Sequence, residues 1–140
     1  MHIVQLPGTD KQLYELVAPL IMNPKVLKQN YKFPFRTSER YEWFIAVEGE
    51  EVEGFVPVEH KASEDVINNY YIKGKDPETL KLLLGHILAQ RDESKDLAAI
   101  SFVEDKGLFQ DLGFMPEKVW TRYVKMKKTP VKNEFIQEKQ

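Results

Sequence analysis

The stretch from the first tryptophan to the middle of the chain constrains the fold most, because it joins a hairpin to a strand–helix–strand unit. Residues 43–58 alternate in polarity on either side of Glu48-Gly49-Glu50, which predicts two strands and a turn. A third strand over 65–72 leads into a helix over 76–91, and an apolar run at 97–103 predicts the strand after it. A hairpin pairs its strands antiparallel, whereas a strand–helix–strand unit pairs them parallel. The sequence therefore predicts an α/β fold, built on a mixed sheet with helices on both faces.

The helix of that unit carries the clearest boundary signals in the chain. Asp76 is a favoured N-cap residue, and Pro77 suits the first helical position. Apolar residues then recur at helical spacing and form one stripe, made of Leu80, Leu83, Leu84, Ile87 and Leu88. We expect this stripe to pack on the sheet.

The chain before the hairpin predicts one strand and two helices. Residues 2–6 suit a short edge strand, and Thr9 with Gln12 suits a capping box that begins a helix. Pro19 should bend or end that helix, because proline lacks the N–H and clashes with the preceding turn. Asn23-Pro24 then suits the start of a second helix.

The chain after residue 103 predicts a short helix and a closing strand. The helix covers about 105–112, Gly113 makes a turn, and the strand covers 119–126. We expect residues 1–128 to form a single domain and residues 129–140 to be a polar C-terminal tail.

Composition excludes several classes of function. The net charge of −2 argues against a nucleic-acid binder, and no apolar run approaches the roughly 20 residues that span a membrane. The chain has no cysteine, so it has no disulfide and no thiolate site, and its three histidines share no metal-ligand spacing. We expect no signal peptide before the first strand. We expect a cytoplasmic protein without a metal site, which binds neither nucleic acid nor membrane.

In this order the elements resemble the GNAT superfamily of N-acetyltransferases. Residues 43–55, which end on Gly-Phe, look like the central hairpin of the family, and residues 70–84 occupy the place of its acetyl-coenzyme A strand, loop and helix. Residues 108–114, which end on Leu112-Gly113-Phe114, and residues 123–128 are similar to its closing signature. The resemblance implies the GNAT-like acyl-CoA N-acyltransferase fold.

The resemblance also implies acetyl-CoA and a place for it. Main-chain groups of Tyr71 and Ile72 would hold the pantetheine arm, and the N–H groups of Thr79 and Leu80 would face the phosphates. A helix N-terminus suits phosphate because its first N–H groups have no partner inside the helix. The implied cofactor-binding residues are Tyr71, Ile72, Lys73, Gly74, Lys75, Thr79, Leu80 and Phe109.

The chain departs from the family at both parts of this site. The family loop reads Gln/Arg-x-x-Gly-x-Gly/Ala, whereas Glu78 and Leu80 stand here where the glycines belong. Pro77 removes one N–H donor, so the phosphate site is degraded. Phe109 stands where many family members have a tyrosine that protonates the leaving thiolate, and phenylalanine has no proton to give.

Four residues remain as candidates for catalysis. Tyr70 and Tyr71, or Tyr123 on the closing strand, are phenols that could replace the missing acid, and the rings of Tyr70 and Tyr71 should point to opposite faces of the sheet. His60 ends the second hairpin strand, where a base for an amine could lie, although a solvated strand end is the simpler interpretation.

Three functions stay open on the sequence. The first is a GNAT-like N-acetyltransferase, which moves an acetyl group from acetyl-CoA to a small-molecule or peptide amine. The second is a non-catalytic module that keeps the GNAT fold to bind a protein partner or a small ligand. The third is an unrelated α+β domain with the same order of elements. Calorimetric titration with acetyl-CoA separates them most directly.

Overall fold

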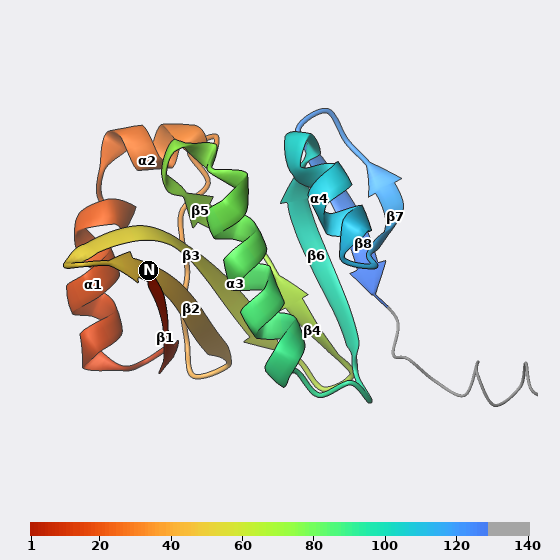
Figure 1. The fold of residues 1–140 in the computed structure, drawn as a ribbon, viewed down its shortest axis with the longest axis horizontal. Coiled ribbons are helices and arrows are strands. Elements are labelled where there is room, and N and C mark those ends of the chain that lie inside the picture. The colour runs from red at the N-terminus through yellow and green to blue at the C-terminus, as the bar shows by residue number, and fades with distance from the viewer. Residues whose placement is uncertain (129–140) are drawn as a thin grey trace, which may run out of the picture.

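A mixed β-sheet lies between two pairs of helices in the computed structural model, which describes residues 1–128 (Figure 1). The predicted tail at 129–140 lies outside the described residues. The strands are β1 (His2–Pro7), β2 (Tyr41–Glu48), β3 (Glu51–His60), β4 (Glu64–Ile67), β5 (Tyr71–Ile72), β6 (Asp96–Phe102), β7 (Met115–Val119) and β8 (Tyr123–Lys128). The helices are α1 (Lys11–Ile21), α2 (Pro24–Gln29), α3 (Pro77–Gln90) and α4 (Lys106–Asp111), with 3-10 turns η1 (Lys73–Lys75) and η2 (Val103–Asp105).

The strand order confirms the predicted mixed sheet. The strands run β1-β2-β3-β4-β6-β8-β7, and β5 pairs separately with β3. The pair β4–β6 is parallel because α3 crosses over between the two strands, and the other pairs are antiparallel. Both the hairpin and the strand–helix–strand unit therefore lie where the sequence predicts them.

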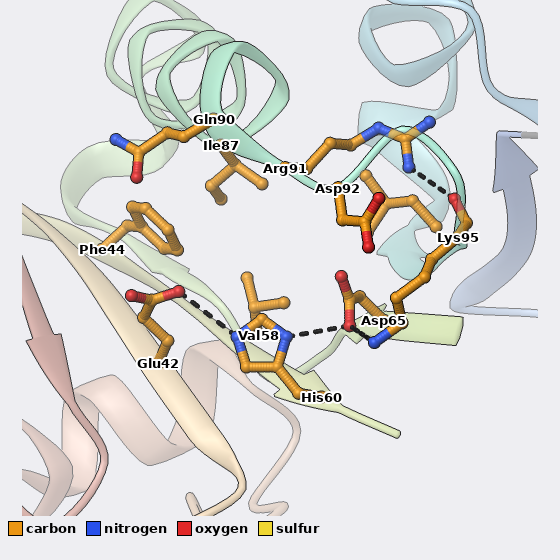
Figure 2. A pocket seen from close by; sticks show the side chains of 11 residues that line it. Glu42, Phe44, Val58, His60, Asp65, Ile87, Gln90, Arg91, Asp92 and Lys95 are labelled. Atoms are coloured by element: carbon orange, nitrogen blue, oxygen red, sulfur yellow. Dashed lines mark hydrogen bonds and ion pairs between the residues drawn. The ribbon is translucent and has the colours of Figure 1, made fainter. Parts of the chain in front are cut away.

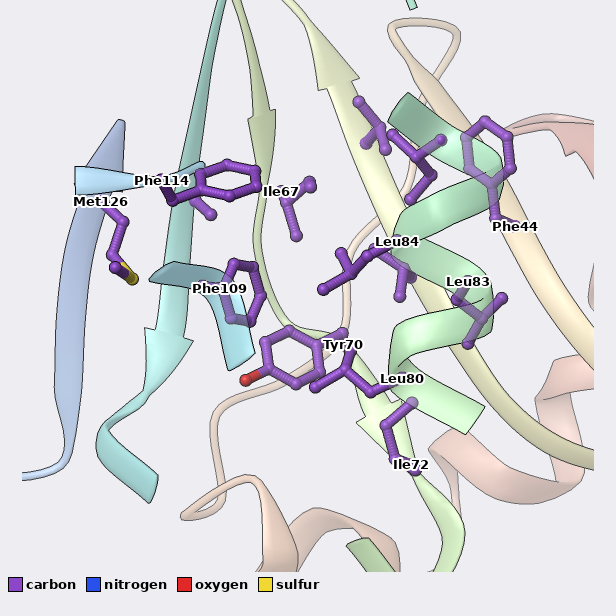
Figure 3. Packing of buried hydrophobic residues seen from close by; sticks show 14 of the residues in the cluster. Phe44, Ile67, Tyr70, Ile72, Leu80, Leu83, Leu84, Phe109, Phe114 and Met126 are labelled. Atoms are coloured by element: carbon purple, nitrogen blue, oxygen red, sulfur yellow. The ribbon is translucent and has the colours of Figure 1, made fainter. Parts of the chain in front are cut away.

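The face of the sheet that α3 and α4 cover holds the larger apolar core (Figure 3). The predicted stripe of α3 packs there, with Leu83 and Leu84 fully buried. The predicted cap is also present, since a carboxylate oxygen of Asp76 accepts a hydrogen bond from the N–H of Glu78. These contacts fix the start of α3, and with it the place of the loop before the helix.

The opposite face is covered by α1 and α2 over a second core around Trp43, Ile45 and Phe55. The cap of α1 differs from the prediction: Asp10, not Thr9, accepts the hydrogen bond from the N–H of Gln12, at 2.8 Å. A carboxylate is an equally favoured cap, so the two neighbours compete, and the sequence pattern alone does not separate them.

Two strand predictions need correction. The third strand is two strands, β4 and β5, because the chain bends at Asn68–Tyr70 and Asn69 has a left-handed backbone (φ 56°). The single closing strand is the hairpin β7–β8. β7 escaped prediction because it is an edge strand, and most of its side chains are exposed, so its sequence lacks a buried face.

No helix in residues 1–128 is long and apolar enough to cross a membrane.

Candidate functional site

The candidate site lies where two neighbouring strands separate. β4 and β6 pair in parallel from Glu64–Ile67, and beyond this point β5 turns away to pair with β3 while β6 continues along β8. The N-terminus of α3 follows β5 directly, through η1. A gap at the carboxyl ends of parallel strands, next to a helix N-terminus, is where α/β proteins commonly bind ligands. We call this gap between β5 and β6 the strand cleft.

The side chain of Tyr70 fills the strand cleft. The residue is 2% exposed, and its ring lies 5.2 Å from that of Phe102 and 5.9 Å from that of Phe109, centroid to centroid. Its hydroxyl accepts a hydrogen bond from the N–H of Phe102 at 2.9 Å and donates one to Oδ2 of Asp105 at 2.6 Å. Figure 3 shows the ring wedged between the α3 side of the core and Phe109.

The pKa values of this pair keep the proton on the tyrosine. Burial raises the pKa of Tyr70 well above its usual range, and the charge of Asp105 raises it further. Burial also raises the pKa of Asp105, and this outweighs the lowering that the hydrogen bond from Tyr70 causes. Tyr70 is therefore a donor to Asp105 and, through its lone pairs, an acceptor for the N–H of Phe102.

On the opposite side of the strand cleft, a main-chain carbonyl is also hydrogen-bonded to a side chain. Gln29, at the end of α2, donates from Nε2 to the carbonyl oxygen of Ile72 at 2.8 Å. About 10 Å³ of free space remains between Gln29, Tyr70, Ile72, Leu80, Phe102 and Asp105. That volume is about the minimum for one water molecule. The chain's own side chains close the cleft.

The N-terminus of α3 offers few free groups. The two carboxylate oxygens of Asp76 accept from the N–H of Glu78 and from the hydroxyl of Thr79, at 3.4 and 2.8 Å. The N–H of Leu80 donates to the main-chain oxygen of Asp76, and the Leu80 side chain is buried in the core. The Leu80 amide expected to face phosphates is therefore engaged inside the helix, and Pro77 has no N–H to offer in its place.

Two lysines flank Gly74 in η1, Lys75 at the mouth of the cleft and Lys73 beside β3, and each is paired with an acidic side chain. Nζ of Lys73 lies 3.2 Å from Glu51, and Nζ of Lys75 lies 3.3 Å from Oε1 of Glu104. The hydrogen bond to Glu51 raises the pKa of Lys73. Gly74 has a left-handed backbone (φ 64°), which turns the chain between the two lysines. The positive charges of both lysines are therefore partly neutralised by glutamates.

His60 lies in a different pocket, at the opposite end of α3 (Figure 2). Its Nδ1 is 2.8 Å from Oδ1 of Asp65, and its Nε2 is 3.3 Å from Oε1 of Glu42. Lys95 also binds Asp65, at 2.7 Å. This cavity of about 180 Å³ is lined by Gln90 and other residues from the C-terminal end of α3. The structure does not bring His60 to the strand cleft.

Tyr71 lies on the opposite face of the sheet from Tyr70, as the sequence predicts for these two consecutive residues. Tyr71 packs against Phe55 in the core under α1 and α2, and burial raises its pKa. Phe109 is fully buried between Tyr70 and Phe114. Among residues 1–128, no three histidine or acidic side chains gather as a metal site.

The structure also has an open depression that the sequence does not predict, which we call the aromatic groove. It has a volume of about 430 Å³ and is lined by Phe33, Tyr41, Trp120 and Tyr123, together with Glu59 and Asn69. Burial raises the pKa of Tyr41, and the charge of Glu59 adds to this. These residues come from separate loops and strand ends, so no local sequence pattern predicts the groove. The groove reaches the bend of β4 and β5 that precedes Tyr70.

Comparison with known proteins identifies the fold. No protein-family model matches the sequence, and no curated protein matches it either. ElaA from Escherichia coli is similar in structure, with a TM-score of 0.73, 13% identity, and coverage of 91% of this chain and 99% of that one. An acyl-CoA N-acyltransferase from Pseudomonas aeruginosa has a TM-score of 0.68 and 13% identity over 92% and 100% of the two chains.

A third similar structure contains ligands. N-acetylglutamate synthase from Neisseria gonorrhoeae, complexed with coenzyme A and N-acetyl-glutamate, has a TM-score of 0.60 and 12% identity. The match covers 94% of this chain and 36% of that one. Together these similarities show that the chain has the fold of the GNAT acyl-CoA N-acyltransferases, as the sequence predicts.

The strand cleft, as its side chains lie, does not fit an acyl-pantetheine arm. An arm would need a space far larger than the 10 Å³ that Tyr70 and Gln29 leave. It would also need free main-chain groups, whereas those of Ile72 and Phe102 are engaged. Binding of an acyl-pantetheine arm therefore requires the side chains of Tyr70 and Gln29 to move.

Proposed function

We propose that the chain is an N-acyltransferase, which moves an acyl group from acyl-coenzyme A to the amine of a small molecule or peptide. The observation that carries this proposal is the separation of β5 from β6 immediately before the N-terminus of α3, in a chain with the acyltransferase fold. A likeness in fold does not by itself specify function, so the proposal rests on this local arrangement as well.

The positive charges of η1, next to the start of α3, support a phosphate-bearing donor. Lys73 and Lys75 stand at η1, between the end of β5 and the start of α3. Lysine binds phosphate as a point charge on a flexible stem, and ion pairs as exposed as these two are weak and exchange readily. Both lysines can therefore leave their acidic partners for an incoming phosphate group.

The direct test is calorimetric titration with acetyl-CoA, followed by release of free thiol in the presence of a panel of amines. We expect measurable binding that Lys75→Glu weakens by roughly threefold or more, because the change removes a positive charge from the mouth and adds a negative one. The matched control is Lys61→Glu, at the turn between β3 and β4, which should bind like the unchanged protein. Absence of binding and of thiol release with every amine would contradict the proposal.

The second candidate is a non-catalytic module that binds a small ligand or a protein partner. The observation in its favour is that the strand cleft is closed and the aromatic groove is open. Phe109, which cannot act as an acid, agrees with it. This function predicts that neither the protein nor any cleft variant binds acetyl-CoA, so the same titration separates the two candidates.

A further inference from the structure

We infer that Tyr70 is the residue that decides whether acyl-CoA enters the strand cleft, because its side chain occupies the cleft and engages the main-chain groups there. This inference rests on the proposed function. It attributes weak binding of acyl-CoA to one side chain in the cleft rather than to the altered loop before α3.

The first argument is the supply of hydrogen bonds. Where two strands separate, the N–H and C=O groups on their facing edges lose their partners, and buried main-chain groups must find others. On β6 the N–H of Phe102 donates to the hydroxyl of Tyr70, and on β5 the carbonyl of Ile72 accepts from Gln29. Two side chains of the protein thus take the places that a ligand in the cleft would take.

The second argument is the way the backbone presents Tyr70. Asn69 has a left-handed backbone (φ 56°), and its side-chain oxygen accepts from Nδ2 of Asn30 at 3.4 Å. The bend ends β4 and places the next residue in the gap between β5 and β6. Asparagine adopts this conformation more readily than other non-glycine residues, so the residue type and the contact with Asn30 both favour the bend.

The third argument is the hydrogen bond from the Tyr70 hydroxyl to Asp105, which we call the latch. Asp105, on η2, receives the hydrogen bond from the Tyr70 hydroxyl, and its neighbour Glu104 pairs with Lys75 on η1. These two contacts join the segments on either side of the cleft mouth. Tyr70 is therefore held by its ring, by its hydroxyl and by the turn that carries it.

The effect of Tyr70 on binding depends on the fraction of molecules in which the cleft is open. A ligand that binds only the open cleft has an apparent Kd equal to its intrinsic Kd divided by the open fraction. Opening breaks both hydrogen bonds of Tyr70 and exposes its ring. We therefore expect the unchanged protein to bind acetyl-CoA at least about tenfold more weakly than a variant without the ring.

The test compares acetyl-CoA titrations of the unchanged protein, Tyr70→Val and Tyr70→Phe. Valine has no ring and so empties the cleft, and Tyr70→Val should therefore bind acetyl-CoA at least about tenfold more tightly than the unchanged protein. Phenylalanine keeps the ring but loses the latch to Asp105, so it should bind with intermediate affinity. Tyr70→Phe also keeps the test valid if the larger truncation prevents folding, which circular dichroism would reveal.

The matched control is Phe44→Val, which empties a similar volume in the same core near the opposite end of α3, away from the cleft residues. It should bind acetyl-CoA like the unchanged protein. Equal affinity of the unchanged protein and both Tyr70 variants would overturn the inference and leave the proposed function standing. Failure of every folded variant to bind would overturn both.

Discussion

Gln29 and Ile72 are 43 positions apart in the sequence, and Nε2 of Gln29 donates to the carbonyl oxygen of Ile72 at 2.8 Å. The bond ties the end of α2 to β5, so the helices of one face support the edge of the strand cleft. Gln29→Ala should lower the free energy of unfolding by about 1 kcal/mol, because it leaves a partly buried carbonyl without this partner. Lys28→Ala, exposed on the same helix, is the control for urea unfolding and should have a smaller effect.

Features that depend on local signals were predictable, whereas features that depend on distant pairs such as Gln29 and Ile72 were not. The hairpin and α3 were predicted because their signals are local: alternation in the strands, a cap at Asp76 and a stripe of leucines. The bend at Asn69 was missed because residues 65–72 have the composition of one strand, and the bend depends on distant contacts such as that with Asn30.

The leucine stripe of α3 gives a direct test of the core. Leu84 is fully buried, whereas Leu82 on the same helix is 44% exposed. Leu84→Ala should cost about 2–5 kcal/mol in denaturant unfolding, since it removes buried groups and leaves a cavity. Leu82→Ala should cost well under that range. Equal losses for the two variants would mean that this face of α3 does not pack on the sheet.

Two glycines should respond to alanine in opposite ways. A Cβ on Gly54 would lie 2.9 Å from Cδ1 of Ile72 and 2.9 Å from the carbonyl oxygen of Tyr71, so Gly54→Ala should cost about 1–3 kcal/mol by forcing β3 and β5 apart. A Cβ on Gly85, inside α3, meets nothing within 4 Å. Gly85→Ala should therefore stabilise the helix by about 0.5–1 kcal/mol. Thermal or urea unfolding of both variants checks the prediction.

The separation of the two strands was predictable, but not what fills it. The resemblance implied a cofactor site at residues 70–84, and β5 separates from β6 beside this stretch. That Tyr70 fills the gap was not readable, because its partners Phe102 and Asp105 lie more than 30 positions away. The predictions that His60, Tyr70 or Tyr71 takes part in catalysis, and that the protein is cytoplasmic, stay predictions.

The buried phenol of Tyr70 predicts a loss of stability in alkali. Its pKa is raised above the usual value of 10.0, so above about pH 10 the folded protein keeps a proton that the unfolded chain releases. Stability then falls as the pH rises, because the folded state binds more protons than the unfolded state. Tyr70→Phe lacks this proton, so the advantage of the unchanged protein over the variant should shrink as the pH rises above about 10.

Urea unfolding of the two proteins from pH 8 to pH 11 measures this difference. Burial also raises the pKa values of Tyr41, Tyr71 and Tyr123, but these residues are present in both proteins and cancel in the comparison. Parallel stability curves would show that Tyr70 has an ordinary pKa, and thus that its hydroxyl is not held in the closed cleft.

Phe109 gives the prediction that bears most on catalysis. The resemblance suggests that Phe109→Tyr restores a proton donor, but Phe109 is fully buried, and its ring lies against those of Tyr70 and Phe114. A hydroxyl added there meets aromatic neighbours instead of a partner, which costs about 1–3 kcal/mol. We therefore expect Phe109→Tyr to be less stable than the unchanged protein and to release thiol no faster. Phe33→Tyr, with a ring that is 54% exposed, is the matched control and should have little effect on stability. A variant that is equally stable and faster would show instead that the ring edge of residue 109 faces the acyl donor, and that the family's general acid can be restored in this chain.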